Sequence, residues 1–438
     1  MEVIYSGYYN IILSYIILTM EESDVIGEGT YGCIHKPSLE CKGRKKVDYV
    51  NKVSKVIDSA HAESELKEYN AVSVVDPKNK YHMGLPIKCQ LKKTKKNRKS
   101  IEKCENPKLK RAFEKDISSL SLLIMNEGGV HLKDFAKKNA HSGSNSELEL
   151  FWIELLRMFY GLYVFQQHNI IHYDLKPQNM VYDESTHRIN FIDFGHMRTM
   201  KKALNDSSKS KNYLSVFHWS YPFESYFLNK VNYTYFAEYT DQEKIGFYQT
   251  ILQKVQEQQS VKGGEGTRKK EGSVKSLIVN FDEVADELVG FFDYITNGMD
   301  KSETSQITLQ YMEDFYNLLM YTIIPHGYNE FVKKSLKTID VYGLGFSIIY
   351  VLNNVSSHMT NEDFIRQLRE LGYKMTTPDL RKRIALEDAL NEYMTILKNS
   401  GFIEKHGVLE TYEISSSKPS CPSGKKYNST KKKCMKKK

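Results

Sequence analysis

The segment His172–Asn179, which reads HYDLKPQN, constrains this chain more than any other part of its sequence. It contains a carboxylate, a lysine and a carboxamide in one short loop, and Ile192–Gly195, which reads IDFG, adds a second carboxylate on a tight turn. Phosphoryl transfer needs little covalent chemistry from a protein, because positioning, metal binding and charge neutralisation perform the catalysis. These residue types at this spacing therefore favour phosphoryl transfer over an ordinary polar loop.

A glycine-rich segment, Gly27–Gly32, reads GEGTYG and lies far upstream of that loop. Glycine lets backbone N–H groups approach phosphate oxygens without obstruction by a side chain. Taken alone, this spacing is more typical of a plain turn. The nucleotide-binding interpretation includes the residues Ile26, Gly27, Glu28, Gly29, Thr30, Tyr31, Gly32 and Ile34.

Together these motifs resemble those of the eukaryotic-type protein kinase family. The resemblance covers about Asp24–Glu224 and Asp340–Leu397. It implies an α+β, bilobal protein kinase fold, in which ATP lies between a β-rich N-lobe and a helical C-lobe. The expected parts are an N-terminal extension at 1–22, the N-lobe at 23–127, the C-lobe at 128–402 with a long insertion at about 225–337, and a basic tail at 403–438.

The resemblance assigns a role to each chemically active residue of the loop and the turn. Asp174 is the expected catalytic base, and Lys176 is expected to neutralise the phosphate during transfer. Asn179 and Asp193 are expected to hold Mg²⁺. His172 is expected to support the loop, while the three glycines of the glycine-rich segment cover the phosphates of ATP.

A lysine on the third strand of the N-lobe is expected to bind ATP as well. Val53–Val56 resembles the V-A-I-K motif of the family, so Lys55 is the expected residue and Lys52 is the alternative. Its partner on the following helix is expected to be Glu65, because large side chains follow it at helical spacing on one face. The alternatives for this partner are Glu63 and Glu68.

Three downstream motifs extend the resemblance into the second half of the chain. Ser220–Glu224, which reads SYPFE, stands where the family has A-P-E, and Asp340–Gly345 resembles the D-x-W-S-x-G start of a buried helix. Asp379–Arg383 resembles the late D-P-x-x-R motif. The resemblance then implies a buried ion pair between Glu224 and Arg383 that braces the activation segment.

The chain departs from the family pattern in three places. Tyr173 replaces the arginine that usually precedes the catalytic Asp and pairs with a phosphate on the activation segment, so we expect activity without that phosphorylation. A Lys- and Cys-rich stretch, Lys88–Cys104, interrupts the N-lobe. Within 225–337, the helical runs Phe281–Ile295 and Leu309–Ile324 are expected to form a small subdomain.

The C-terminal segment Cys421–Cys434, which reads CPSGKKYNSTKKKC, resembles a two-cysteine adaptor motif that giant (nucleo-cytoplasmic large) DNA viruses append to kinases and other enzymes. The resemblance implies a viral kinase in the cytoplasm of an infected cell, with Cys421 and Cys434 in an element that docks a partner. The alternative is a disordered lysine tail that binds acidic surfaces weakly.

Charge and hydropathy narrow the possible partners. The net charge of +8 is concentrated at 416–438, which carry nine lysines and no acid and leave the remainder at −1, so no specific nucleic-acid partner is expected. The apolar run Tyr8–Met20 is short and interrupted by Asn and Ser, so no membrane span is expected. Six scattered cysteines favour a reduced, intracellular compartment over a secreted disulfide framework.

The expected function is the phosphorylation of protein serine or threonine hydroxyls, since tyrosine kinases usually lack Lys176–Pro177 after the catalytic Asp. The alternative is a catalytically inactive kinase-fold scaffold. Inactive relatives generally lose the ATP lysine, the base or the metal-binding Asp, and this chain has a candidate for each. Small-molecule kinases rarely combine Asp-Phe-Gly with the late arginine.

Overall fold

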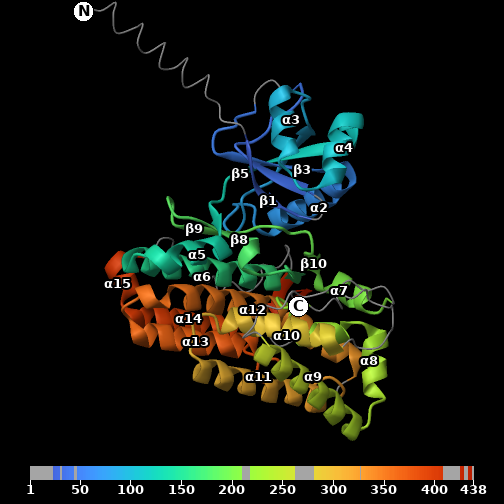
Figure 1. Ribbon diagram of the computed structural model, residues 1–438, viewed down its shortest axis with the longest axis vertical. Coiled ribbons are helices and arrows are strands. Elements are labelled where there is room, and N and C mark those ends of the chain that lie inside the picture. Colours follow the sequence, from blue (N-terminus) through green and yellow to red (C-terminus); the bar gives the residue numbers. More distant parts are fainter. Residues whose placement is uncertain are drawn as a thin grey trace, which may run out of the picture.

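The computed structural model describes residues 23–407 apart from 30–31, 44–46, 210–217, 262–280 and 326, together with two strands at 425–428 and 433–436. A small lobe with a sheet stands above a larger helical lobe (Figure 1). The expected N-terminal extension at 1–22 lies outside the described residues, as do Thr30, Tyr31 and Cys421.

A five-stranded antiparallel sheet forms the small lobe. Its strands, in spatial order, are β1 (Asp24–Glu28), β2 (Gly32–Lys36), β3 (Lys52–Asp58), β5 (Leu120–Asn126) and β4 (Ile87–Gln90). Lys55 on the central strand β3 pairs with Ile34 of β2 on one side and with Leu123 of β5 on the other. This register places the lysine in the middle of the sheet, beside the glycine-rich hairpin.

Three helices pack on this sheet. The first, α2 (Ser59–Val75), begins after Asp58, whose carboxylate accepts a hydrogen bond from the Ala60 N–H at 2.9 Å and caps the helix. Its buried face consists of Ala62, Glu65, Tyr69 and Val72. The Lys- and Cys-rich stretch forms strand β4, helix α3 (Lys95–Glu102) and, just beyond it, helix α4 (Pro107–Lys115).

Four cysteines that are far apart in the sequence form two disulfides in the small lobe. Cys33 bonds to Cys104, and Cys41 bonds to Cys89. These cysteines are scattered in the sequence, and sheet pairing and α3 bring them together, so their spacing gives no signal of the pairing. The intracellular compartment remains a prediction.

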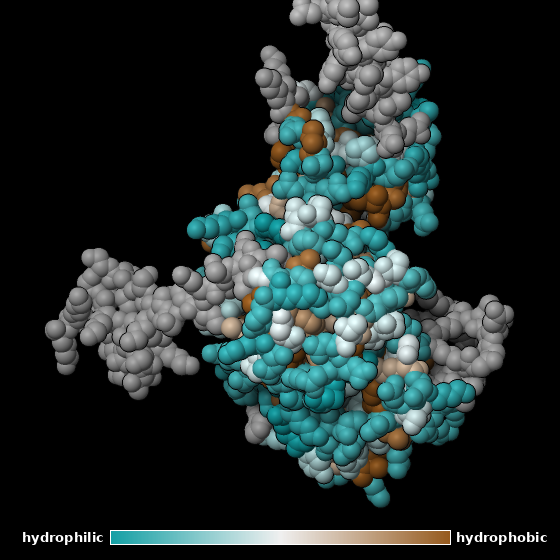
Figure 2. Space-filling view, turned by 90° about the vertical axis from the view of Figure 1, so that its left-hand side faces the viewer, coloured by the Kyte–Doolittle hydropathy of each residue, from teal (hydrophilic) through white to brown (hydrophobic). Residues whose placement is uncertain are grey.

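The helical lobe is built around the long helix α12 (Tyr328–Val355). Its other main helices are α5 (Leu132–Ser142), α6 (Asn145–Gln167), α13 (Glu362–Thr376), α14 (Leu386–Ser400) and α15 (Phe402–His406). α12 packs against α5, α6, α10 and α13, and α14 packs against α6 (Figure 1). On the face shown in Figure 2, the surface of this lobe is mostly hydrophilic, as expected where the apolar side chains are packed inside.

The described part of residues 225–337 adds the helices α8 (Lys230–Ala237), α9 (Asp241–Val261), α10 (Phe281–Ile295) and α11 (Lys301–Tyr321). They do not form a separate subdomain. Leu288 and Phe315 share one buried cluster with Tyr342 and Phe346 of α12, because the apolar faces of these helices have no other core to enter. These helices are therefore part of the helical lobe.

The start of α12 also differs from the expectation. The helix begins at Tyr328, inside the range predicted as an insertion, and Asp340 lies within it rather than at its start. Phe331, Val332 and Leu336 are buried and continue the apolar face upstream of Asp340. The helix from Tyr328 to His358 is long and apolar enough to cross a membrane, but 83% of its apolar window is packed inside the protein, which makes it no clear span.

The basic tail contains a two-stranded antiparallel hairpin. Strand β11 (Lys425–Asn428) pairs with β12 (Lys433–Lys436), and Tyr427 lies opposite Cys434. The hairpin connects at residues that lie outside the described part of the chain.

Candidate active site

A cleft of about 470 Å³ lies between the two lobes. Its upper wall comes from the glycine-rich hairpin and β3, and its back comes from Glu65 on α2 and from Met125–Gly129, at the end of β5 and just beyond it. Its floor comes from Gln178, Asn179, Ile192 and Asp193. Most residues that the sequence assigned to nucleotide binding therefore line one cavity, of a size that suits a small-molecule ligand.

The glycine-rich segment forms the turn between β1 and β2. The Gly29 N–H donates to the Gly32 carbonyl at 2.9 Å, and Ile26 and Ile34 line the cleft. A Cβ atom at Gly32 would lie 3.0 Å from both the Lys55 Cε and the Val56 carbonyl oxygen. Glycine at this position thus leaves room for the lysine side chain under the hairpin.

Glu28 lines the cleft and also ties the hairpin to the added helices of the small lobe. The Glu105 N–H donates to both oxygens of the Glu28 carboxylate, at 2.7 Å to Oε1 and 2.9 Å to Oε2. Cys33, five residues further along the hairpin, is bonded to Cys104, next to Glu105. The hydrogen bonds of Glu28 and the disulfide of Cys33 therefore attach the glycine-rich hairpin to the segment between α3 and α4.

Lys55 reaches across the cleft to α2. Its Nζ lies 2.7 Å from the Glu65 Oε2, and both side chains are largely buried. Lys52, the alternative, donates to Asn126 at the surface, and Glu63 pairs with Lys88 outside the cleft. The structure thus brings together Lys55 and Glu65, whereas their alternatives face other partners.

Glu68, the third candidate on α2, faces the activation segment instead of Lys55. Burial, together with the nearby charges of Glu65 and Asp193, raises the pKa of Glu68 to about 7. The charges of Lys202 and Arg198 oppose this shift but do not cancel it. A half-buried carboxyl that titrates near neutral pH thus lies next to the site.

The catalytic-loop residues converge on the carboxylate of Asp174. The Lys176 Nζ lies 3.0 Å from both carboxylate oxygens, and the Asn179 Nδ2 donates to Oδ2 at 2.9 Å. Burial alone would raise the pKa of Asp174, but the charge of Lys176 and the hydrogen bonds from Tyr221 and Lys176 hold it below its ordinary value. Asp174 is therefore ionised at neutral pH and can accept the proton of a hydroxyl group.

Oxygen donors suited to Mg²⁺ lie on the floor of the cleft. Asp193 follows strand β9 (Arg188–Phe191) and has a left-handed backbone with φ of +57°, which turns the chain sharply before Phe194. Phe194 is buried between Tyr69, at 5.2 Å, and His172, at 5.3 Å between ring centroids. The Asp193 carboxylate and the Asn179 carboxamide are hard oxygen ligands of the kind that Mg²⁺ prefers, so these residues fit the metal.

Asp340 of α12 fixes the backbone of the expected catalytic loop. Its carboxylate accepts hydrogen bonds from the backbone N–H groups of His172 and Tyr173, each at 2.8 Å. Burial raises the pKa of Asp340, although His172 and these hydrogen bonds act against the shift. Tyr173 has φ of +74°, a backbone conformation that is costly for a residue with a side chain and that these contacts hold in place.

Glu224 and Arg383 form the expected ion pair. The Arg383 Nη1 and Nη2 donate to the Glu224 Oε1 and Oε2 at 2.5 and 3.0 Å, and neither side chain is exposed to solvent. Ser335 of α12 donates a further hydrogen bond to Glu224 at 3.4 Å. The pair therefore joins the end of the activation segment to α12 and to the segment before α14.

Sequence reasoning gave no role to Tyr221, which contacts the expected catalytic loop, as does Arg198. The Tyr221 hydroxyl donates to the Asp174 Oδ1 at 2.7 Å. The Arg198 guanidinium lies 5.4 Å from the centre of the Tyr173 ring and 3.6 Å from the Asp206 carboxylate. The only available signal was the position of Tyr221 within the SYPFE motif, and the contact itself depends on tertiary folding.

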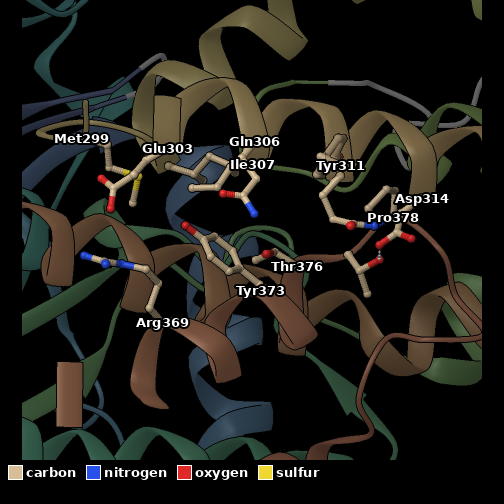
Figure 3. Close-up of a pocket in the computed structure, with 13 residues that line it drawn as sticks. Met299, Glu303, Gln306, Ile307, Tyr311, Asp314, Arg369, Tyr373, Thr376 and Pro378 are labelled. Atoms are coloured by element: carbon tan, nitrogen blue, oxygen red, sulfur yellow. Dashed lines mark hydrogen bonds between the residues drawn. The ribbon is translucent and has the colours of Figure 1, made fainter. Parts of the chain in front are cut away.

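A second cavity of about 340 Å³ lies in the helical lobe, between α11 and α13 (Figure 3). Glu303, Gln306 and Tyr311 project into it from α11, and Arg369 and Tyr373 project from α13. Its one aspartate, Asp314, accepts hydrogen bonds from Thr377 at 2.7 Å and from Lys382 at 2.6 Å. None of the phosphoryl-transfer motifs of the sequence lies in this lining, so the cavity is not a candidate for phosphoryl transfer.

One further group in the described part of the chain combines potential metal ligands, namely Cys33, His35 and Cys104, whose ligand atoms lie within 4.8 Å of one another. Metal binding by cysteine requires the free thiolate. Because the two sulfur atoms are bonded to each other, this group is a disulfide beside a histidine in this structure.

Comparison with known proteins agrees with the chemistry of the cleft. A family model described as the protein kinase domain matches residues 85–216, a range that contains the catalytic loop and Asp193 but not the glycine-rich hairpin or Lys55. This match supports a protein kinase domain, a phosphotransferase fold that generally uses ATP and a divalent metal. No curated protein sequence matches the chain.

Among solved structures, the chain is similar to the PK-1 kinase of the Cydia pomonella granulovirus, with 18% sequence identity and a TM-score of 0.27. The alignment covers 48% of this chain and 66% of the granulovirus kinase.

Proposed function

We propose that this chain is a serine/threonine protein kinase that transfers the γ-phosphate of ATP to hydroxyl groups of other proteins. The observation that carries this proposal is the position of Asp174, an ionised carboxylate beside Lys176 in a cleft that also contains Asp193 and the Lys55–Glu65 pair. This set contains each group that phosphoryl transfer to an alcohol requires.

ATP would bind under the glycine-rich hairpin. Glu65, at 2.7 Å, holds the Lys55 ammonium inside the cleft, where its charge would lie near the phosphates. The absence of a side chain at Gly32 leaves that approach open. Asn179 and Asp193 would hold Mg²⁺, which supplies charge neutralisation on the phosphate oxygens.

Asp174 would orient the acceptor hydroxyl and receive its proton. A carboxyl with a lowered pKa is ionised before the substrate arrives, so no proton must leave it first. Lys176, 3.0 Å from Asp174, would stabilise the negative charge that develops on the transferred phosphate. The Lys176–Pro177 pair after Asp174 favours serine and threonine over tyrosine as acceptors.

The second part of the proposal is that the kinase is viral and acts on host or viral proteins inside the infected cell. Its support is the C-terminal segment Cys421–Cys434, which resembles the viral adaptor motif. The β11–β12 hairpin lies in a lysine-rich segment. A hairpin of this kind would dock a partner while the kinase domain performs the transfer. Removing residues 416–438 should then leave turnover of a generic peptide unchanged and weaken capture of a specific partner.

The test is the transfer of labelled phosphate from ATP to a basic protein, followed by identification of the phosphorylated amino acids. Wild-type protein should produce phosphoserine and phosphothreonine, and Asp193→Asn should remove the signal because it loses the metal-binding carboxylate. Asp48→Asn, an exposed residue outside the cleft, is the matched control and should retain activity. Label found only on tyrosine, or full activity of Asp193→Asn, would contradict the proposal.

A further inference from the structure

Tyr221 donates a hydrogen bond directly to the proposed catalytic base. Its hydroxyl oxygen lies 2.7 Å from the Asp174 Oδ1, and its ring packs against Tyr173 with 5.5 Å between the ring centroids. Tyr221 comes from the end of the activation segment, one residue before Pro222 and three before Glu224. This contact joins a side chain with the same functional group as a substrate alcohol to the atom that must receive the alcohol proton.

The contact also completes the hydrogen bonding of Asp174. An ionised carboxylate offers about four acceptor positions. Lys176 contacts both oxygens at 3.0 Å, Asn179 donates to Oδ2 at 2.9 Å, and Tyr221 takes the remaining position on Oδ1. With Asp174 buried, a substrate hydroxyl can bond to it only after one of these donors leaves.

Tyr221 is the donor best suited to leave. Asn179 belongs to the same loop as Asp174 and is held a second time by the Asp174 carbonyl at 2.6 Å. Lys176 also belongs to this loop and carries the charge that the transferred phosphate needs. Tyr221 alone comes from a different segment, and burial together with the charge of Asp174 raises its pKa, so that it stays a neutral hydrogen-bond donor.

We propose that the Tyr221 hydroxyl occupies the acceptor position of the active site, and that a protein substrate must displace it before phosphate transfer. This inference rests on the proposed kinase function and adds a residue that restrains substrate entry. A segment that delivers a serine or threonine hydroxyl to Asp174 would push the tyrosine aside and take over its hydrogen bond. Substrates that fail to move Tyr221 would find no free acceptor position on the base.

The test compares wild type with Tyr221→Phe, which keeps the ring and removes the hydroxyl. We expect the KM for a basic serine peptide, and the Kd of the same fluorescein-labelled peptide measured without ATP, to fall roughly fivefold to tenfold, the size of one typical hydrogen bond. The kcat should not fall.

Tyr226→Phe is the matched control, since Tyr226 is a partly buried tyrosine of the same segment that does not contact Asp174. It should leave KM and Kd unchanged. A drop in kcat for Tyr221→Phe with KM and Kd unchanged would overturn the inference and make Tyr221 a positioning residue for Asp174. Unchanged values for every parameter would also overturn it, whereas wild-type transfer to serine would still support the proposed function.

Discussion

Lys55 and Glu65 meet across the back of the cleft, with 2.7 Å between the Lys55 Nζ and the Glu65 Oε2. Lys55 lies on the central strand β3, and Glu65 lies on the buried face of α2. The ion pair between them therefore holds α2 against β3. Because a one-residue change of register moves a strand side chain to the opposite face, the contact depends on the pairing of β3 with both of its neighbours. The geometry of the nucleotide site is thus linked to the packing of the small lobe.

Glu68 should make stability depend on pH between the ordinary carboxyl range and neutrality. Its pKa is raised to about 7 in the folded protein, first by burial and then by Glu65, so the folded state binds more protons than the unfolded state in that interval. Stability contributed by this group should therefore be greatest below about pH 4.5 and be lost as the pH rises through 7. In urea unfolding at pH 6 and pH 8, Glu68→Gln should reduce the difference between the two pH values, and an unchanged difference would exclude Glu68 as its source.

The Glu224–Arg383 pair should be costly to break from one side. Glu224→Gln leaves the Arg383 guanidinium buried without a counter-charge, which should reduce the free energy of unfolding by about 3 kcal/mol. Arg366→Ala, which removes an exposed cation on α13, is the control and should unfold like the wild type. Equal unfolding midpoints for Glu224→Gln and wild type would show that the pair does not brace the fold.

Activity should survive removal of phosphate from the activation segment. Helix α7 (Met200–Ser207) packs Ala203 into the core without any phosphate, and Arg198 is engaged by the Tyr173 ring and Asp206. The alanine variant covers Thr199, Ser207, Ser208, Ser210 and Ser215. It should lose less than tenfold in kcat, equivalent to about 1.4 kcal/mol. A collapse of activity after phosphatase treatment, restored by rephosphorylation, would instead assign a phosphate-binding role to a basic residue such as Arg198.

The disulfides should appear as two specific bridges in peptide mapping under non-reducing conditions. Cys33 should be found with Cys104 and Cys41 with Cys89, and loss of either bridge should cost roughly 4 kcal/mol by the chain-entropy estimate for loops of 71 and 48 residues. Rapid alkylation of Cys33 and Cys104 in the native protein without a reductant would contradict this pairing.

The parts of the site that follow from local sequence could be predicted, and those that depend on long-range packing could not. Asp174, Lys176 and Asn179 lie in one loop, so their convergence is set by local geometry. The Lys55–Glu65 contact could be inferred because a strand and the next helix are adjacent in the chain. The contact of Tyr221 with Asp174 spans 47 residues and leaves no periodic signal in the sequence.

The same distinction applies to the fold. The helix at Phe281–Ile295 could be predicted at its observed bounds, because its apolar residues recur at helical spacing. Its packing against α12 could not, since a helix with an apolar face can be buried in a separate subdomain or in a shared core. The upstream extension of α12 to Tyr328 could not be predicted from the Asp340 motif, because that motif lies inside the helix and does not mark its start.

The central claim, that the cleft transfers phosphate from ATP, is tested most directly by comparing two lysines of one strand. Lys55→Met should lower phosphate transfer to a basic protein roughly a hundredfold or more while the thermal unfolding midpoint stays near that of wild type, because it removes a positioned charge from the site. Lys52→Met, which changes a lysine that faces Asn126 at the surface, should retain most of the activity. Full activity of Lys55→Met together with an inactive Lys52→Met would contradict the account.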